Sequence, residues 1–206
     1  MGKLPGKISI VCPFFNEEAI IESSVQLMLD NLSRLDREWE LIIVDDGSTD
    51  RSFEIAQSLA IQHAKLSVLH YPSNRGRGHA IRFGAARASG DILITTEIDS
   101  SWGDDIVARI VKVFEDDFDT DLVIASPHLP GGGYKNVPLR RILISRVGNW
   151  LLRRLLGSKM TMFTGMTRGY KRRSFNLLPL HEPGKELHLE ILDKADAFNF
   201  HIKEVP

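Results

Sequence analysis

Short apolar segments alternate with stretches of helical periodicity through the first 125 residues, and this alternation constrains the fold more than any other feature of the chain. The segments that we predict to be strands are Ile8–Cys12, Leu41–Val44, Leu66–His70, Ile92–Thr96 and Leu122–Ala125. They are apolar along most of their length rather than at every second residue, which is typical of strands buried on both faces of a sheet. Strands that alternate with helices favour a mostly parallel sheet with helices on both faces. We therefore expect an α/β fold.

The second half of the chain has a different pattern. A glycine run at 131–133 predicts a connector without regular structure. Residues 139–156 then predict an amphipathic helix, Glu186–Phe198 has helical spacing, and Phe200–Val205 is a predicted strand. No strand is predicted between residues 157 and 185.

At 206 residues the chain is long enough for one sizeable domain. The lone Cys12 excludes an internal disulfide and fits a reducing compartment. No window has the roughly 18 uncharged apolar residues of a membrane span, and the first residues lack the apolar core of a signal peptide. We therefore expect one domain over residues 1–206, located in the cytoplasm.

Acidic side chains follow the predicted strands where they end. Asp45 and Asp46 follow the second strand, and Glu97 and Asp99 follow the fourth. Ligands of parallel sheets bind beyond the carboxyl ends of the strands. Carboxylates crowded there repel one another unless a cation lies between them or one stays protonated, and such oxygen ligands suit Mg²⁺ or Mn²⁺. The alternative is structural, because Asp-Gly turns are common and acidic loops cap helices.

Residues 74–78 form the basic, glycine-rich sequence Asn-Arg-Gly-Arg-Gly and lead directly into a predicted helix. Backbone N–H groups and positive charge at a helix N-terminus suit a diphosphate, so Arg77 is a candidate contact for one. The spacing matches neither a Walker A loop nor a dinucleotide-binding fingerprint. Taken alone, this segment is therefore only weakly specific for a diphosphate ligand.

Basic residues are concentrated in one part of the chain. Residues 134–181 contain 11 Lys or Arg and no Asp or Glu, although the whole chain has 27 acidic residues. One side of the predicted helix at 139–156 carries Leu139, Leu143, Val147, Leu151 and Leu155, flanked by Arg140, Arg141, Arg146, Arg153 and Arg154. A solvated basic face is one interpretation, and contact with an anionic membrane surface is the one we favour. No base-reading module accompanies the charge, so we expect no nucleic acid partner.

Three segments make a family recognisable, namely Val11–Glu18 (VCPFFNEE), Val44–Asp50 (VDDGSTD) and Asn74–Gly84 (NRGRGHAIRFG). Looser matches follow in order at Leu139–Ser145, Thr164–Arg172, Glu190 and Glu204–Pro206. With these motifs, the run from Ile8 to Pro206 resembles the family 2 glycosyltransferases, and within them the dolichol-phosphate mannosyltransferase-like branch. The resemblance implies a GT-A (Rossmann-like) fold, in which residues 1–130 form the nucleotide-sugar-binding half and residues 131–206 the acceptor-side half.

The resemblance also implies roles for the residues at the strand ends. The base and ribose of the nucleotide would be cradled by Pro13, Phe15, Asn16 and Glu17. Asp45 would bond the base, and Asp46 would support that pocket. Glu97 and Asp99 occupy the positions of the family's DxD motif, where an acidic pair binds a divalent metal ion, Mg²⁺ or Mn²⁺, on the diphosphate. Glu97 departs from the family pattern, which has Asp there.

The acceptor side follows from the same resemblance. In the polyprenol-phosphate branch, a basic residue and a Ser four positions later grip the acceptor phosphate, and Arg141 and Ser145 have this spacing. Arg168 would lie near the same phosphates. The candidate catalytic residues are Asp99, Arg141, Ser145 and Arg168. A phosphate acceptor is already ionised at neutral pH, so positioning and electrostatic stabilisation would carry catalysis without a strong general base.

The predicted function is inverting, metal-dependent transfer of a sugar from a nucleotide-sugar of the GDP-mannose or UDP-glucose type to a polyprenyl or dolichyl phosphate. The enzyme would be cytoplasmic and peripheral at the membrane. One alternative is a family 2 transferase that acts on a saccharide, which would need a carboxylate such as Glu190 near the acceptor. Another is a nucleotide-sugar-binding subunit with weakened catalysis, suggested by Glu97 and by Met162, where relatives commonly have Asp.

Overall fold

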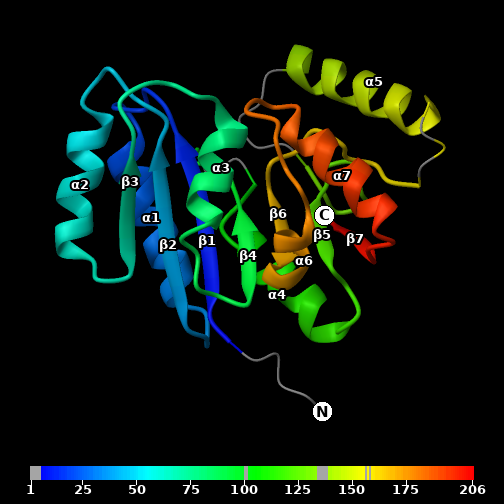
Figure 1. Cartoon of the computed structure of the whole chain (residues 1–206), viewed down its shortest axis with the longest axis horizontal. Coiled ribbons are helices and arrows are strands. Elements are labelled where there is room, and N and C mark those ends of the chain that lie inside the picture. Colours follow the sequence, from blue (N-terminus) through cyan, green and yellow to red (C-terminus); the bar gives the residue numbers. More distant parts are fainter. Residues whose placement is uncertain (1–5, 100–101, 134–138, 156, 158) are drawn as a thin grey trace.

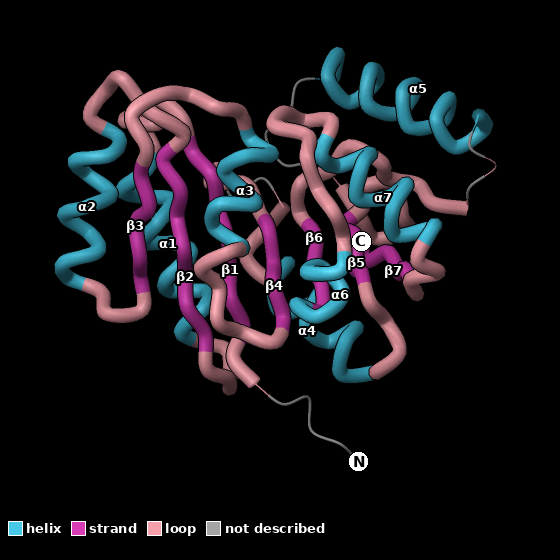
Figure 2. The backbone as a smooth tube through the Cα atoms, in the orientation of Figure 1, coloured by secondary structure: helices cyan, strands magenta, loops and turns pink. Residues whose placement is uncertain are grey.

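The computed structural model describes residues 6–99, 102–133, 139–155, 157 and 159–206. Its centre is a seven-stranded sheet in the order β3-β2-β1-β4-β6-β5-β7 (Figures 1 and 2). The strands are β1 (Ile8–Phe14), β2 (Trp39–Asp45), β3 (Leu66–His70), β4 (Ile92–Thr95), β5 (Leu122–Ala125), β6 (Arg168–Lys171) and β7 (Ile202–Val205).

The sheet is parallel in one half and mixed in the other. The pairs β3–β2, β2–β1 and β1–β4 are all parallel. β6 is antiparallel to both β4 and β5, and β7 pairs in parallel with β5. The α/β fold with a mostly parallel sheet, predicted from the alternation of apolar segments and helices, is therefore confirmed.

Helices cover both faces of the sheet. They are α1 (Ile21–Ser33), α2 (Ser52–Gln62), α3 (Arg77–Ala85), α4 (Ile106–Asp116), α5 (Leu139–Leu155), α6 (Arg172–Leu177) and α7 (Leu187–Ala197). Residues of α1, α2 and α4 join one hydrophobic core, and residues of α3, α6 and α7 join the other. Along β1 the side chains alternate between the two, since Ile10 and Cys12 belong to the first core and Val11 to the second.

The sequence pattern does not indicate β6 or α6. β6 begins at Arg168 and ends at Lys171, so it lacks the apolar character of the other central strands. Both charged side chains are nonetheless buried. Lys171 donates a hydrogen bond to the carbonyl of Phe118, and Arg168 donates to three other carbonyls. Buried charge of this kind is tolerated because its donors are satisfied.

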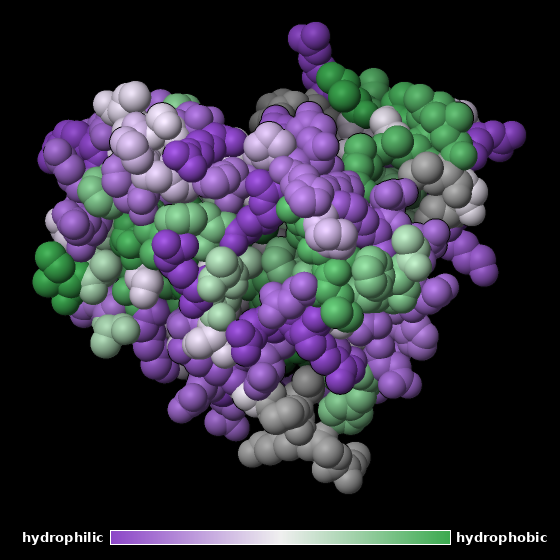
Figure 3. Space-filling model, viewed as in Figure 1, coloured by the Kyte–Doolittle hydropathy of each residue, from purple (hydrophilic) through white to green (hydrophobic). Residues whose placement is uncertain are grey.

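Helix α5 lies outside the sheet, beyond α7 in Figure 1. It is attached through Asn149, which is buried and whose Oδ1 accepts a hydrogen bond from the N–H of Phe163 at 2.7 Å. The predicted apolar stripe of Leu139, Leu143, Val147, Leu151 and Leu155 is exposed, together with Ile144 and Trp150. Figure 3 shows this apolar surface above the rest of the molecule. Within the described residues, no helix combines the length and the hydropathy needed to cross a membrane.

Candidate active site

The carboxyl ends of four parallel strands meet at one edge of the sheet. The register pairs Phe14 of β1 with Asp45 of β2, and Asp45 with His70 of β3. On the other side of β1, β4 ends at Thr95, shortly before Glu97. The loops that leave these strands carry the residues that the sequence places at the strand ends.

The loop after β1 is held against the loop after β2. Asn16 has a φ of +54°, in the left-handed region that Asn adopts more readily than most residues. Its N–H donates to Ser48 Oγ at 2.9 Å, and its Oδ1 accepts from the N–H of Thr49 at 2.8 Å. The N–H of Glu17 donates to Ser52 Oγ at 2.7 Å. These bonds fix the backbone of the loop at the edge of the sheet.

The same loop brings the four expected base and ribose contacts together. Pro13 is buried within β1, and Phe15 is 41% exposed at the end of the strand. An open aromatic ring of this kind suits contact with a flat ligand such as a nucleobase. The contact of Pro13, Phe15, Asn16 and Glu17 with a nucleotide stays a prediction.

Asp46 organises the loop between β3 and α3. Its Oδ1 accepts hydrogen bonds from Tyr71 Oη at 2.7 Å, from the N–H of Arg75 at 2.8 Å and from the N–H of Gly76 at 3.2 Å. Burial, together with the hydrogen bond to Asp46, raises the pKa of the Tyr71 hydroxyl, which therefore stays a donor. Gly76 has a φ of +93°, a conformation that favours glycine, and it directly precedes α3. Asp46 thus holds the loop before α3, and its support of a nucleotide pocket stays a prediction.

Asp45 occupies a different position from the one that a direct base contact needs. The residue is fully buried, at 0% exposure. Its Oδ1 accepts from the N–H of Ser48 at 3.1 Å, and its Oδ2 lies 2.7 Å from His70 Nδ1. Because the residue has no exposed surface, the expected direct bond to the base is not available to Asp45 in this structure.

A cleft of about 440 Å³ brings the two halves of the predicted site together. Its lining includes Arg77, Glu97 and Asp99 from the sheet edge and Ser145 from α5. The expected metal pair, the expected diphosphate contact and the expected acceptor serine therefore share one cavity. Arg141 also belongs to α5, but its side chain lies outside the described part of the structure.

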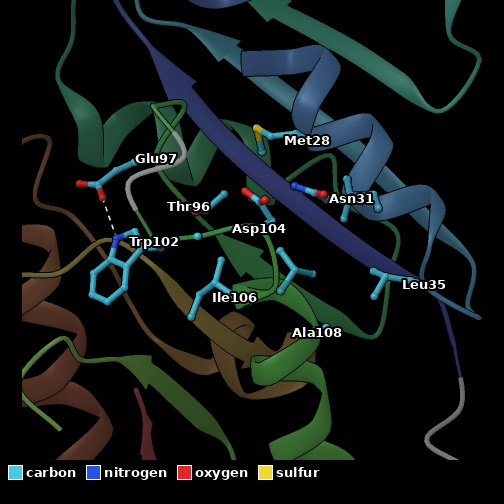
Figure 4. A pocket seen from close by; sticks show the side chains of 12 residues that line it. Met28, Asn31, Leu35, Thr96, Glu97, Trp102, Asp104, Ile106 and Ala108 are labelled. Atoms are coloured by element: carbon cyan, nitrogen blue, oxygen red, sulfur yellow. Dashed lines mark hydrogen bonds between the residues drawn. The ribbon is translucent and has the colours of Figure 1, made fainter. Parts of the chain in front are cut away.

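Glu97 is held from two sides. Trp102 Nε1 donates a hydrogen bond to Glu97 Oε2 at 2.9 Å, and Figure 4 shows the carboxylate pointing toward the indole. Arg77 Nη1 lies 3.9 Å from Glu97 Oε1, close enough for an ion pair. A small cavity of about 60 Å³ lies behind this contact, between α1 and α4. The side chain of Glu97 is therefore oriented by its neighbours.

Negative charge is concentrated at the end of β1 and β4. Burial, followed by the nearby charges of Asp99 and Asp50, raises the pKa of Glu17. Burial also raises the pKa of the Cys12 thiol, with further contributions from Glu97 and Asp99. The negative charges of these carboxylates repel one another, and a cation placed between them would relieve that repulsion. Two carboxylates in one cleft are oxygen ligands of the kind that suit Mg²⁺ or Mn²⁺, and metal binding by Glu97 and Asp99 stays a prediction.

Arg168 does not reach the cleft, and its expected contact with phosphates is wrong for this structure. Its residue exposure is 0%. Its guanidinium donates to the carbonyls of Gly165 at 2.8 Å, His188 at 2.9 Å and Phe163 at 2.6 Å. Arg168 therefore joins β6 to the segment before it and to α7, as a structural residue.

Glu190 also has a structural role. Its carboxylate accepts from the N–H groups of His181 at 2.9 Å and Glu182 at 2.9 Å, and it pairs with Lys194 Nζ at 2.6 Å. Burial acts to raise the pKa of Glu190, but these donors outweigh it, so the pKa is lowered. The carboxylate holds the 181–182 segment, and it is not placed to act as a base in the cleft.

The structure adds cleft residues that the sequence pattern did not single out. Lys185, Glu186 and Leu189 line the cleft at the start of α7. Their only signal in the sequence is proximity to the looser match at Glu190. Thr164, the first residue of the looser match at Thr164–Arg172, lines the cleft as well. Met162 also lines the cleft.

Proteins with similar sequences include two whose names refer to undecaprenyl phosphate and to polyprenol. Residues 9–178 match the family described as glycosyl transferase family 2. Over 178 residues, the chain is 30% identical to the undecaprenyl-phosphate 4-deoxy-4-formamido-L-arabinose transferase of Pectobacterium atrosepticum, which covers 85% of this chain and 52% of that protein. Over 204 residues it is 26% identical to the polyprenol monophosphomannose synthase of Mycolicibacterium smegmatis, covering 96% and 75% of the two chains. The chain thus spans about half the length of the first relative.

Similar solved structures contain a metal ion and a nucleotide. Glucosyl-3-phosphoglycerate synthase from Mycobacterium tuberculosis, in complex with Mn²⁺, UDP-glucose and phosphoglyceric acid, has a TM-score of 0.70 and 25% identity, covering 97% of this chain and 69% of that one. The same enzyme with Mg²⁺ and UDP has a TM-score of 0.69 and 26% identity, covering 97% and 68%. With the family match over most of its length, this chain belongs to glycosyl transferase family 2.

Proposed function

We propose that this chain catalyses the inverting transfer of a sugar from a nucleoside diphosphate sugar to a polyprenyl phosphate, with Mg²⁺ or Mn²⁺ bound. The observation that carries the proposal is the cleft lined by Glu97, Asp99 and Ser145. It combines a carboxylate pair for the metal on the donor with the serine expected to contact the acceptor phosphate. The names of the two sequence relatives, which refer to undecaprenyl phosphate and to polyprenol, support this class of acceptor.

Glu97 and Asp99 would hold the metal ion. Mg²⁺ is usually bound by one or two carboxylates, and water and substrate phosphates fill its other positions. Within the described residues, no group of three or more His, Cys, Asp or Glu forms a complete site. A pair of carboxylates that the donor diphosphate completes is consistent with this absence. When bound, the metal would neutralise charge that develops on the diphosphate leaving group.

The cleft also offers cations for the two phosphorylated substrates. Arg77 is the first residue of α3 and lines the cleft, so its guanidinium can contact the donor diphosphate. Lys185 also lines the cleft and is exposed, which suits it to the acceptor phosphate that Ser145 would contact. Catalysis would then rest on alignment of the acceptor oxygen and on compensation of charge.

Two kinds of acceptor can be compared, a phosphate and a saccharide hydroxyl that Glu190 would deprotonate. The structure agrees better with the phosphate. A hydroxyl acceptor must lose its proton to a base within hydrogen-bond reach. Glu190 is engaged by two backbone N–H groups and by Lys194. Glu186 does line the cleft, and this observation makes transfer to a hydroxyl, with Glu186 as base, the second candidate function.

The outward side of α5 would bind the surface of an anionic membrane. Seven large apolar side chains of this helix are exposed, from Leu139 to Leu155. Arginines flank them, and the helix contains no acidic residue. Apolar residues beside unopposed arginines are typical of helices that lie in the interface of anionic bilayers. Because Ser145 on the same helix lines the cleft, this orientation would place the cleft next to the lipid that carries the acceptor phosphate.

The experiment measures transfer of labelled sugar from GDP-mannose and from UDP-glucose to a short-chain polyprenyl phosphate, with and without Mn²⁺. We expect transfer that requires metal and falls about 100-fold in Asp99→Ala, with little change in Glu186→Gln. Asp193→Ala is the matched control, since Asp193 is an exposed acid on α7. Equal rates in wild type and Asp99→Ala would refute the metal site. Transfer only to saccharides, with loss in Glu186→Gln, would establish the second candidate.

A further inference from the structure

We propose that His70 reads the base of the donor, with its Nε2 accepting a hydrogen bond from a ring N–H of the base while its Nδ1–H is held by Asp45. The bases with such a group are uracil, at N3, and guanine, at N1. The proposal rests on the proposed function, because it concerns the donor of that same reaction. It replaces the direct contact of Asp45 with an indirect one.

The carboxylate of Asp45 is enclosed by the protein. It is fully buried, its Oδ1 accepts from the N–H of Ser48 at 3.1 Å, and its Oδ2 lies 2.7 Å from His70 Nδ1. Because none of its surface is exposed, a base could reach this carboxylate only if the groups that cover it moved. The side chain that extends from Asp45 toward solvent is His70, which is 35% exposed.

The tautomer of His70 follows from its contact with Asp45. A carboxylate can only accept hydrogen bonds, so the Nδ1 that faces Asp45 must carry a proton. In a neutral imidazole, the other nitrogen, Nε2, is then an acceptor. The ring of Phe53 stacks on the imidazole with centroids 4.2 Å apart and planes inclined by 26°. The hydrogen bond and the stacking together fix both the plane and the rotation of the ring, as binding sites that read hydrogen bonds require.

The position of His70 can be compared with that of the rest of the donor site. His70 ends β3, and the register places it beside Asp45, which lies beside Phe14 and thus close to the exposed Phe15. Glu97 and Asp99 follow β4, three strands away from β3 in the sheet order. Three inter-strand spacings are roughly 14 Å, a span suited to an extended nucleoside diphosphate. A donor with its diphosphate at Glu97 and Asp99 would therefore bring its base to the ends of β2 and β3.

A hydrogen-bond acceptor at Nε2 of His70 would distinguish between the bases of different donors. Uracil and guanine present a ring N–H and would complete the bond with Nε2. Cytosine and adenine present a ring nitrogen with a lone pair at the corresponding edge, so two acceptors would face each other and both would lose water. The chemistry of His70 therefore selects UDP-sugars and GDP-sugars against CDP-sugars and ADP-sugars.

The test measures binding of UDP, GDP, CDP and ADP by calorimetry in the presence of Mn²⁺, so that it does not depend on transfer. We expect the wild-type protein to bind UDP or GDP at least about tenfold more tightly than CDP and ADP. In His70→Asn, a shorter amide can still donate to Asp45 but places no acceptor where Nε2 was. We expect this variant to lose most of the preference. His63→Asn, at the residue that follows α2, is the control and should keep the preference.

A methylated nucleotide tests the same bond without any mutation. UDP methylated at N3, or GDP methylated at N1, lacks the proton that Nε2 would accept, and we expect the wild-type protein to bind it at least about tenfold more weakly. Equal affinity for the methylated and unmethylated nucleotides would overturn the role of His70. An unchanged preference among the nucleotides in His70→Asn would overturn it too. Neither result would contradict the proposed transfer reaction. Failure of every nucleotide to bind would instead overturn the proposed function and this inference with it.

Discussion

Trp102 donates its indole N–H to Glu97 Oε2 at 2.9 Å, so the first acid of the expected metal pair is oriented by an aromatic side chain five residues later. Glu97 has a longer side chain than the Asp of the family pattern and would otherwise have more freedom. The other carboxylate oxygen, Oε1, lies 3.9 Å from Arg77. Residues behind a metal ligand commonly set the orientation of that ligand. Trp102 and Arg77 therefore limit the orientations open to the Glu97 carboxylate.

Removal of the indole N–H should weaken the metal site. In Trp102→Phe, the aromatic surface is largely kept but Glu97 loses its donor, and we expect the affinity for Mn²⁺ in the presence of UDP to fall about tenfold. Electron paramagnetic resonance of free Mn²⁺ measures this affinity. Trp150→Phe, on the exposed side of α5, is the matched control. Unchanged Mn²⁺ affinity in Trp102→Phe would show that the hydrogen bond does not position the carboxylate.

Replacement of Arg168 should destabilise the fold. Arg168→Met leaves three buried carbonyls without their donor, those of Phe163, Gly165 and His188. We expect the free energy of unfolding to fall by about 3 kcal/mol or more, because unsatisfied buried groups each cost about 1–3 kcal/mol. Urea denaturation measures the change, with the exposed Arg173→Met as control. Full stability combined with a selective loss of transfer would instead restore the predicted role at the acceptor phosphate.

The parallel half of the sheet could be predicted because its strands are buried on both faces and are therefore apolar throughout. β6 could not be predicted in this way. Its charged ends are buried only because carbonyls distant in sequence, such as those of His188 and Phe118, accept their hydrogen bonds. Local sequence pattern contains no information about such partners. The same reason applies to α5. Its apolar stripe is visible in the sequence, whereas the hydrogen bond between Asn149 and Phe163 that attaches the helix is not.

The sequence predicted which residues form the candidate site more readily than how those residues are arranged. Family motifs placed Glu97, Asp99 and Ser145 in one site, and the structure brings them into one cleft. The sequence did not show that His70 covers Asp45, because that pairing depends on the register between β2 and β3. Register follows from packing of the whole sheet rather than from either strand alone.

Glu40 should make stability depend on pH in the acid range. Its carboxylate accepts from Lys7 Nζ at 2.7 Å, from Ser9 Oγ at 2.5 Å and from the N–H of Ser89 at 2.7 Å. Burial acts to raise the pKa of Glu40, but these donors outweigh it and lower the pKa from 4.5 to about 2. Because the pKa in the folded protein lies below the ordinary value, the stabilisation is complete above about pH 4.5 and is lost as the pH falls through 2.

We therefore expect Glu40→Gln to be less stable than the wild type at neutral pH, with a difference that shrinks as the pH falls from 4.5 toward 2. Urea denaturation at a series of pH values measures this difference. Glu38→Gln is the control, because Glu38 is exposed and lies two residues earlier in the chain. A difference for Glu40→Gln that stays constant over this range would contradict the argument.

The outward side of α5 should govern binding to anionic vesicles. Each arginine near an anionic membrane surface contributes about 1 kcal/mol, so the triple variant Arg140→Gln, Arg153→Gln and Arg154→Gln should bind phosphatidylglycerol vesicles roughly 100-fold more weakly. Flotation with vesicles measures the bound fraction. A control variant with Arg51, Arg87 and Lys112 changed to Gln removes the same charge from exposed positions outside α5 and should bind like the wild type.

The apolar side chains of α5 allow a second, independent measurement. Leu143, Val147 and Leu151 are exposed, so their replacement by Ser should leave the free energy of unfolding nearly unchanged while it removes the area that enters the bilayer. We expect this variant to lose most of its binding to phosphatidylglycerol vesicles even at low salt, whereas the arginine variant should lose binding chiefly through its weaker attraction to negative charge. Equal binding of all variants, or wild-type binding to neutral phosphatidylcholine vesicles as strong as to anionic ones, would assign the apolar surface of α5 to a partner other than an anionic membrane.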